Sequence, residues 1–239
     1  MSEPVTVLLC QAPTGLASGE RMAWIERMLA TPVDTSAKIA VFPELFMSGY
    51  GASVADPATA YRHDQDRVAQ VQRCCEADQA WAVIGAVTRD EAGYRNSALC
   101  LAPDGSLHAQ QHKCRLFGDD EAAAFVPAEE PAIFHTPLGR TGMAICFDIE
   151  DPALVAQYAQ LGAAWVLTPT ANMRPYTLVP SVKVRARALD NALGIVYANY
   201  TGDDRGLDFP GDSIVVDAQG GVQGQLGCAP GVLQVQVQP

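Results

Sequence analysis

The chain has 239 residues, of which 49% are apolar or aromatic, and a formal net charge of −11. This length suits one α/β domain that buries roughly three quarters of the surface of its unfolded chain. The acidic balance argues against binding to nucleic acid or to anionic membranes, and no apolar run approaches the length of a membrane span.

Short apolar or β-branched runs recur along the chain, with helical patterns between them. The predicted strands are VTVLLC, AKIAVF, WAVIGAV, SALCLA, TGMAIC, AAWVLTP, GIVYANY and SIVVDA. The first of them, Val5 to Cys10, follows no basic segment and therefore indicates a strand rather than a signal peptide. Apolar spacing predicts helices around residues 22–29, 68–75 and 154–161. No linker rich in Pro, Gly or Ser divides the chain, so we expect a single domain over residues 1–239.

Cys146 lies in the segment GRTGMAICFDIEDP, where a strand-like run, Thr141 to Ile145, precedes it and Pro152 starts a predicted helix. A strand-to-helix turn exposes a nucleophile beside free backbone N–H groups, which can lower the pKa of a thiol and bind an oxyanion. The alternative is a buried cysteine that packs as a small apolar side chain. Two other segments favour the catalytic interpretation.

The first of these segments, VFPELFMSGY, has one carboxylate, Glu44, within an apolar and aromatic run. The second, HKCRLFGDDE, has Lys113 at the end of an alternating stretch and Glu121 at the start of a predicted helix. Charged groups are seldom buried without a partner or a task. A glutamate can take the proton of an attacking thiol, and a lysine can stabilise the tetrahedral intermediate. Together with Cys146, these residues predict nucleophilic catalysis.

The three motifs FPELFMSGY, HKCRLFGDDE and GMAICFDIEDP, in this order, resemble those of the nitrilase superfamily of carbon–nitrogen hydrolases. The resemblance extends from VTVLLCQA to FPGDSIVVDAQGG, so it covers nearly the whole chain. It implies that Glu44 is the general base, Lys113 the stabilising cation and Cys146 the nucleophile. Glu121 matches a second glutamate, which positions the substrate beside the lysine.

The resemblance also changes the expected fold. Alternation of strands and helices alone favours one doubly wound parallel sheet. The resemblance implies instead a four-layer αββα sandwich, in which two mixed sheets pack face to face and helices cover the outside.

Three further residues are expected to bind substrate. Phe147 follows the nucleophile, and its backbone N–H is an expected donor to the oxyanion. Asn172, in PTANM, follows a predicted strand end at which the family lines its acyl pocket. Asparagine is also a common turn residue, which leaves a structural role open. Tyr50 ends the glutamate motif and is the third expected contact.

True nitrilases of this superfamily usually have Trp-Glu after the cysteine, whereas this chain has Phe147 and Asp148. We therefore expect an amidase that converts a small carboxamide to a carboxylic acid and ammonia through a thioester. A nitrilase or an N-carbamoyl amide hydrolase with the same residues is the nearer alternative. A non-catalytic binding protein of this fold is the more distant one. The chemistry requires no cofactor, and a homodimer is one candidate oligomeric state.

A metal site is not expected. His108 and His112 precede Cys114 and could share a metal on a helix, but they follow the turn signal PDG in a stretch that reads as extended. The chain has seven cysteines, an odd number without the spacing of a disulfide framework. Such usage indicates a reducing compartment, so we expect a cytoplasmic protein.

Overall fold

The computed structural model describes residues 3–239 and contains two six-stranded mixed sheets. In the first sheet, β1, β2 and β3 run parallel, whereas β4, β5 and β14 extend it by antiparallel pairing. Its strands, in spatial order, are β14 (Gly231–Val237), β1 (Val5–Gln11), β2 (Lys38–Val41), β3 (Trp81–Asp90), β4 (Gly93–Leu101) and β5 (Leu107–His112).

The second sheet repeats this plan. Its strands β7, β8 and β9 run parallel, and β6, β12 and β13 pair antiparallel at the two sides. In spatial order they are β13 (Val222–Gln225), β12 (Ile214–Val216), β9 (Gly194–Ala198), β8 (Trp165–Pro169), β7 (Gly139–Met143) and β6 (Ile133–Thr136). A separate hairpin joins β10 (Thr201–Asp204) to β11 (Leu207–Pro210).

The two sheets pack face to face through an apolar core. Val7, Val83 and Leu9 of the first sheet and Leu167 and Val196 of the second belong to one cluster of fully buried side chains. Helices cover the outer faces, so most strands are buried on both sides. This explains why they read as continuous apolar runs rather than as alternating patterns.

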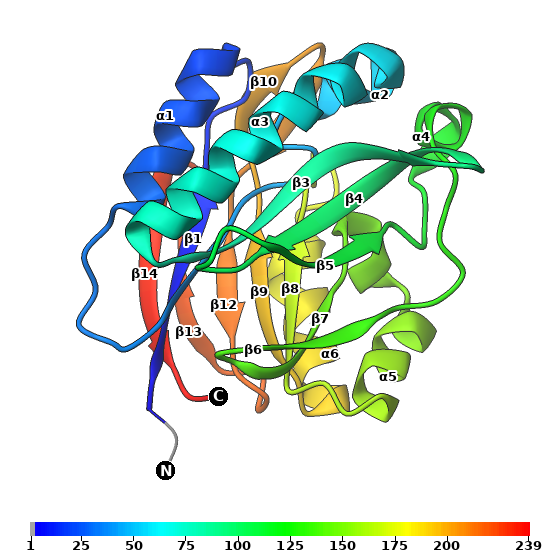
Figure 1. Cartoon of the computed structure of the whole chain (residues 1–239). Coiled ribbons are helices and arrows are strands. Elements are labelled where there is room, and N and C mark those ends of the chain that lie inside the picture. Colours follow the sequence, from blue (N-terminus) through cyan, green and yellow to red (C-terminus); the bar gives the residue numbers. More distant parts are fainter. Residues whose placement is uncertain (1–2) are drawn as a thin grey trace.

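Figure 1 shows the helices on the two outer sides of the sheets. The helices α1 (Ser18–Leu29) and α3 (Pro57–Asp78) pack on the first sheet, and α5 (Pro152–Gln160) and α6 (Val184–Asn191) pack on the second. In α1 the buried residues Ile25, Met28 and Leu29 recur at helical spacing. Pro152 begins α5 after an Asp151 side chain that accepts from two backbone N–H groups, as an N-cap does.

This architecture confirms the four-layer αββα sandwich, and the single doubly wound sheet favoured by alternation alone is wrong. Each predicted strand run contains a strand. The strand before the nucleophile ends at Met143, however, and a short 3₁₀ helix over Cys146–Glu150 leads to α5. Glu121 lies inside α4 (Gly118–Ala124) rather than at its start. Within residues 3–239, no helix is long and apolar enough to cross a membrane.

Candidate active site

The predicted catalytic residues meet where strands of both sheets end. Glu44 lies in the turn after β2, Lys113 directly follows β5, and Cys146 comes shortly after β7. The backbone N–H of Glu44 donates to the carbonyl oxygen of Thr170, which directly follows β8, at 3.3 Å. The carboxyl ends of parallel strands are where open α/β sheets place their sites, and here two sheets contribute to one site.

Lys113 is buried between two carboxylates. Its Nζ donates to Glu44 Oε1 at 2.6 Å and to Glu121 Oε1 at 2.8 Å, and all three side chains have no exposed surface. Burial alone would disfavour the ammonium form, but the two carboxylates outweigh it and raise the pKa of Lys113. The lysine is therefore a fixed cation in a site that excludes water.

Glu44 has one engaged and one free carboxylate oxygen. Oε1 accepts from Lys113 and, at 2.7 Å, from Nδ2 of Asn96. Oε2 is buried and has no hydrogen-bond partner within residues 3–239. Burial raises the pKa of Glu44, and the neighbouring Lys113 opposes this shift. A desolvated carboxylate with one unpaired oxygen is suited to accept a proton.

The turn that holds Glu44 packs directly on β3. The backbone N–H of Met47 donates to the carbonyl oxygen of Gly85 at 3.1 Å. A Cβ atom added at Gly85 would lie 2.1 Å from the backbone nitrogen of Leu45. Only glycine therefore allows this close approach of strand and turn.

Glu121 links the lysine to the substrate side of the site. Besides Lys113, its Oε1 accepts from the Tyr50 hydroxyl at 2.7 Å, and its Oε2 accepts from the backbone N–H of Phe117 at 3.0 Å. Burial and the nearby carboxylates raise the pKa of Tyr50, which keeps its hydroxyl a donor. The three donors fix the position of Glu121.

Cys146 stands at a strained turn, with a φ of +48° that non-glycine residues rarely adopt. The expected lowering of its thiol pKa is wrong. Burial raises the pKa of Cys146, the Glu44 carboxylate adds to this, and Lys113 only partly opposes it. The thiol is consequently protonated at neutral pH, and a base must remove its proton as it attacks.

Asp148 is a buried carboxylate that the motif reasoning missed. It accepts from the backbone N–H of Ile145 at 2.9 Å, of Cys114 at 3.0 Å and of Arg115 at 2.7 Å. It thus joins the turn of the nucleophile to the loop of Lys113. Burial outweighs these three donors and raises the pKa of Asp148 to about 7. In the sequence, Glu150 and Asp151 follow it closely, so it does not stand alone among apolar residues as Glu44 does.

Cys146 opens into a narrow inner pocket of about 10 Å³. The three predicted substrate contacts, Tyr50, Phe147 and Asn172, all line it. The ring of Phe117 meets that of Phe147 edge to face at 5.5 Å. Asn172 donates through Nδ2 to the carbonyl oxygen of Tyr176 at 3.1 Å, so its amide plane is fixed at the pocket wall.

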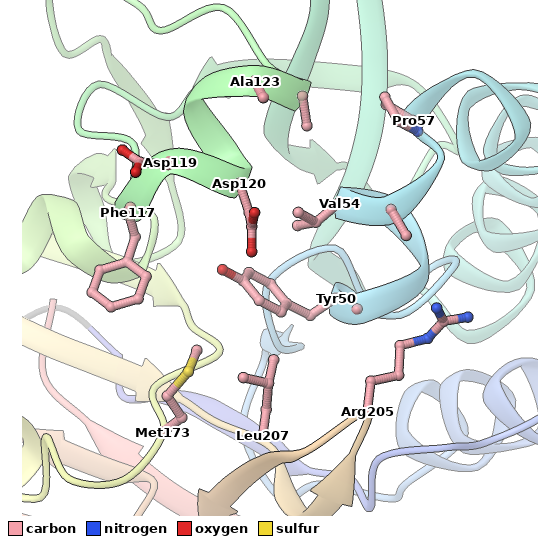
Figure 2. A pocket seen from close by; sticks show the side chains of 14 residues that line it. Tyr50, Val54, Pro57, Phe117, Asp119, Asp120, Ala123, Met173, Arg205 and Leu207 are labelled. Carbon is pink, nitrogen blue, oxygen red and sulfur yellow. The ribbon is translucent and has the colours of Figure 1, made fainter.

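A wider outer pocket of about 660 Å³ adjoins the inner one and shares Tyr50, Phe117 and Met173 with it. Figure 2 shows Tyr50 in the middle of this pocket, with Arg205 and Leu207 approaching from the β10–β11 hairpin. The two pockets together form a passage from the surface to the thiol.

The histidines that precede Lys113 have other partners. His108 Nε2 lies 2.7 Å from the carbonyl oxygen of His135, and His112 Nδ1 lies 2.8 Å from the Ser97 hydroxyl. In the part of the chain that the structure describes, no group of three or more His, Cys, Asp or Glu side chains is arranged to hold a metal ion.

Comparisons with known proteins agree with this geometry. A family model described as carbon–nitrogen hydrolase matches residues 6–239. An (R)-stereoselective amidase of a Pseudomonas species is 35% identical over 193 residues, which cover 78% of this chain and 68% of that amidase. A hydrolase in the pqqF 5′ region of Pseudomonas protegens is 31% identical over 189 residues, which cover 78% of this chain and 66% of that hydrolase.

The fold has close counterparts among solved structures. An amidase from a Nesterenkonia species superposes with a TM-score of 0.89 at 28% identity, covering 98% of this chain and 90% of that one. A glutamate-to-glutamine mutant of that amidase has the acetamide moiety of fluoroacetamide added covalently at its active-site cysteine.

Proposed function

The chain belongs to the carbon–nitrogen hydrolase family, and from this premise we propose that it is an amidase that hydrolyses a small carboxamide through a thioester on Cys146. Membership of the family confirms the resemblance read from the three motifs. The observation that carries the proposal is the buried cluster in which Glu44 and Glu121 share the Lys113 ammonium, next to the thiol.

Acylation begins when the Cys146 sulfur attacks the carbonyl carbon and Glu44 takes the thiol proton through its free Oε2. The oxyanion is stabilised by Lys113 and by the backbone N–H of Phe147. This N–H lies in the first turn of the 3₁₀ helix, where backbone donors have no intrahelical acceptor. The C–N bond then breaks, and Glu44 returns the proton to the leaving nitrogen, which departs as ammonia.

Deacylation uses the same groups in reverse roles. Water occupies the place of the ammonia, Glu44 takes one of its protons, and the resulting hydroxide attacks the thioester. The C–S bond breaks as the second oxyanion collapses, and the sulfur recovers its proton from Glu44. Lys113 keeps its proton throughout, because the two carboxylates stabilise its charged form.

The distribution of hydrogen-bond acceptors favours an amide over a nitrile. Glu44 Oε2 is unpaired, and the Asn172 side chain at the pocket wall uses its Nδ2 elsewhere. A carboxamide nitrogen brings N–H donors to such acceptors, whereas a nitrile nitrogen brings none. A site built to accept hydrogen bonds discriminates strongly against a substrate without donors.

The proposal is tested by intact-mass measurement after exposure to a set of small amides, with Cys146→Ala as the control. We expect an added acyl mass on the wild-type protein and none on Cys146→Ala, whose turnover should fall by at least 10³-fold because the nucleophile is absent. Its thermal midpoint should stay close to that of the wild type. Substantial amide turnover by Cys146→Ala would contradict the proposal.

The alternatives differ in their products. A nitrilase would release ammonia from nitriles, and an N-carbamoyl hydrolase would release carbon dioxide together with ammonia. Measuring both gases over a panel of amides, nitriles and N-carbamoyl compounds separates the three activities. A non-catalytic protein would release neither, and an alkylating agent would label its Cys146 slowly.

Two further features complete the proposal. All seven cysteines are free, which agrees with a reducing compartment such as the cytoplasm. A homodimer stays a prediction, and light scattering on the purified chain would test it.

A further inference from the structure

The outer pocket is much larger than the reaction of a small amide requires. Its volume is about 660 Å³, whereas the inner pocket beside the thiol has about 10 Å³, which is room for about one water molecule. Most of its lining is apolar, and its apolar residues are Tyr50, Val54, Ala55, Pro57, Phe117, Ala123, Ala124, Met173 and Leu207.

The position of the base decides which end of an amide can lie in this pocket. The leaving nitrogen must approach Glu44, which takes up and returns the proton, and the Glu44 side chain is completely buried. The nitrogen therefore lies on the Glu44 side of the thiol. Glu44 lines neither the inner nor the outer pocket, so a nitrogen substituent directed toward it would find no room in either of them. The acyl chain must leave in the other direction, past Tyr50, Phe117 and Met173 into the outer pocket.

We propose that the outer pocket is an acyl-chain subsite, and that the preferred substrates are primary amides with an extended, uncharged aliphatic acyl chain. This proposal rests on the proposed amidase function and adds to it the length of the acyl chain and the requirement for an unsubstituted nitrogen. Burial of each methylene of such a chain would raise kcat/KM by roughly three- to fourfold.

The charges at the rim disfavour an acyl chain that ends in a carboxylate. Asp119 and Asp120 line the pocket opposite a single cation, Arg205, and all three residues are exposed. The net charge of the chain is −11, so the long-range field also repels anions. A neutral acyl chain avoids both of these repulsions and contacts the apolar lining.

The first test compares two isomers, hexanamide and N-butylacetamide, with acetamide as the reference. We expect kcat/KM for hexanamide to exceed that for acetamide by tenfold or more, and we expect N-butylacetamide to be hydrolysed at least tenfold more slowly than acetamide. Glutaramate, whose acyl chain ends in a carboxylate, should be poorer than hexanamide. Equal values for the two isomers, or a preference for glutaramate, would overturn the proposal.

The second test narrows the pocket with Ala123→Phe in α4. Ala122 and Ala123 are both exposed, but only Ala123 lines the outer pocket, as Figure 2 shows. Ala123→Phe should lose most of the advantage of hexanamide over acetamide and keep the turnover of acetamide. Ala122→Phe should keep both, and thermal midpoints would verify that each variant is folded.

The two proposals fail in different ways. Turnover of acetamide without a gain for hexanamide, or the same chain-length dependence in Ala123→Phe as in the wild type, would overturn the acyl-chain subsite alone. Absence of turnover on every amide would overturn the proposed function together with it.

Discussion

At the scale of single residues, the site depends on one cation shared by two anions. Lys113 lies between Glu44 and Glu121 with no exposed surface on any of the three side chains. A buried ion pair is weak support for stability, because desolvation offsets much of its Coulomb energy. The arrangement instead gives Lys113 a fixed position and leaves Glu44 with one free oxygen. We therefore propose that these side chains serve catalysis rather than folding.

Glu121→Gln tests this assignment. The substitution leaves a neutral Lys113–Glu44 pair, but the glutamine NH₂ group would face one of the three donors that Glu121 accepts from. We therefore expect the free energy of unfolding to drop by about 1–3 kcal/mol, with the protein still folded. Lys113 would lose one of its two anchors, and kcat should fall by about 10²-fold, as on removal of an oxyanion donor. The Glu121 carboxylate also raises the pKa of Glu44. Its removal should lower that pKa and move the acidic limb of the kcat/KM profile to lower pH, because Glu44 acts as a base only when ionised.

Glu129→Gln is the control for this experiment. Glu129 is exposed and follows the same helix, so its substitution removes the same charge without touching the site. We expect its activity and its pH profile to match those of the wild type. Wild-type kcat in Glu121→Gln would remove this residue from the catalytic machinery.

At the scale of secondary structure, the relative position of two loops depends on Asp148. One carboxylate accepts N–H groups from the turn before Cys146 and from the loop after Lys113, and so joins elements that follow strands of different sheets. Glu44 could be found from the sequence because it stands alone in an apolar run. Two of the three donors to Asp148, Cys114 and Arg115, lie more than thirty residues away in the chain, so no local pattern reveals them.

Asp148→Asn should loosen this connection. The carbonyl oxygen of the asparagine can still accept on one side. Its NH₂ group would face a backbone N–H that has an acceptor in the wild type and would lose it in the variant. We expect kcat to fall by roughly 10²-fold, which is the cost of a displacement of about 1 Å between nucleophile and cation, while KM changes little. The free energy of unfolding should drop by about 1–3 kcal/mol through the unsatisfied buried donor.

Asp151→Ala separates the effect of loop position on kcat from the effect of lower protein stability. Asp151 caps α5 and pairs with Arg115 at 2.7 Å, but it does not contact the turn before Cys146. Its loss should cost about 0.5–2 kcal/mol of stability. If this variant lost as much kcat as Asp148→Asn, the effect at Asp148 would reflect general destabilisation rather than loop placement.

At the scale of the whole molecule, the strand runs could be predicted but their assignment to two sheets could not. Strands buried on both faces read as continuous apolar runs, and such a run does not indicate which other strand it pairs with. The pairing of β14 with β1 joins the two ends of the chain. Only the family resemblance, which carries long-range information, predicted the second sheet. The outer pocket likewise combines segments from α2 (Tyr50–Ala55), α4 and the β10–β11 hairpin that no motif connects.

Because each sheet supplies part of the site, catalysis should depend on how the sheets pack and much less on the outer helices. Leu167 is fully buried in the core between the sheets, and Leu154 is fully buried between α5 and the second sheet. Replacement of either by alanine should cost about 2–5 kcal/mol of stability. Only Leu167→Ala leaves a cavity between the sheets that carry Lys113 and Cys146. Measured well below both thermal midpoints, kcat should fall several-fold in Leu167→Ala and stay near wild type in Leu154→Ala. Equal kcat values in the two variants would show that the packing between the sheets does not control the geometry of the site.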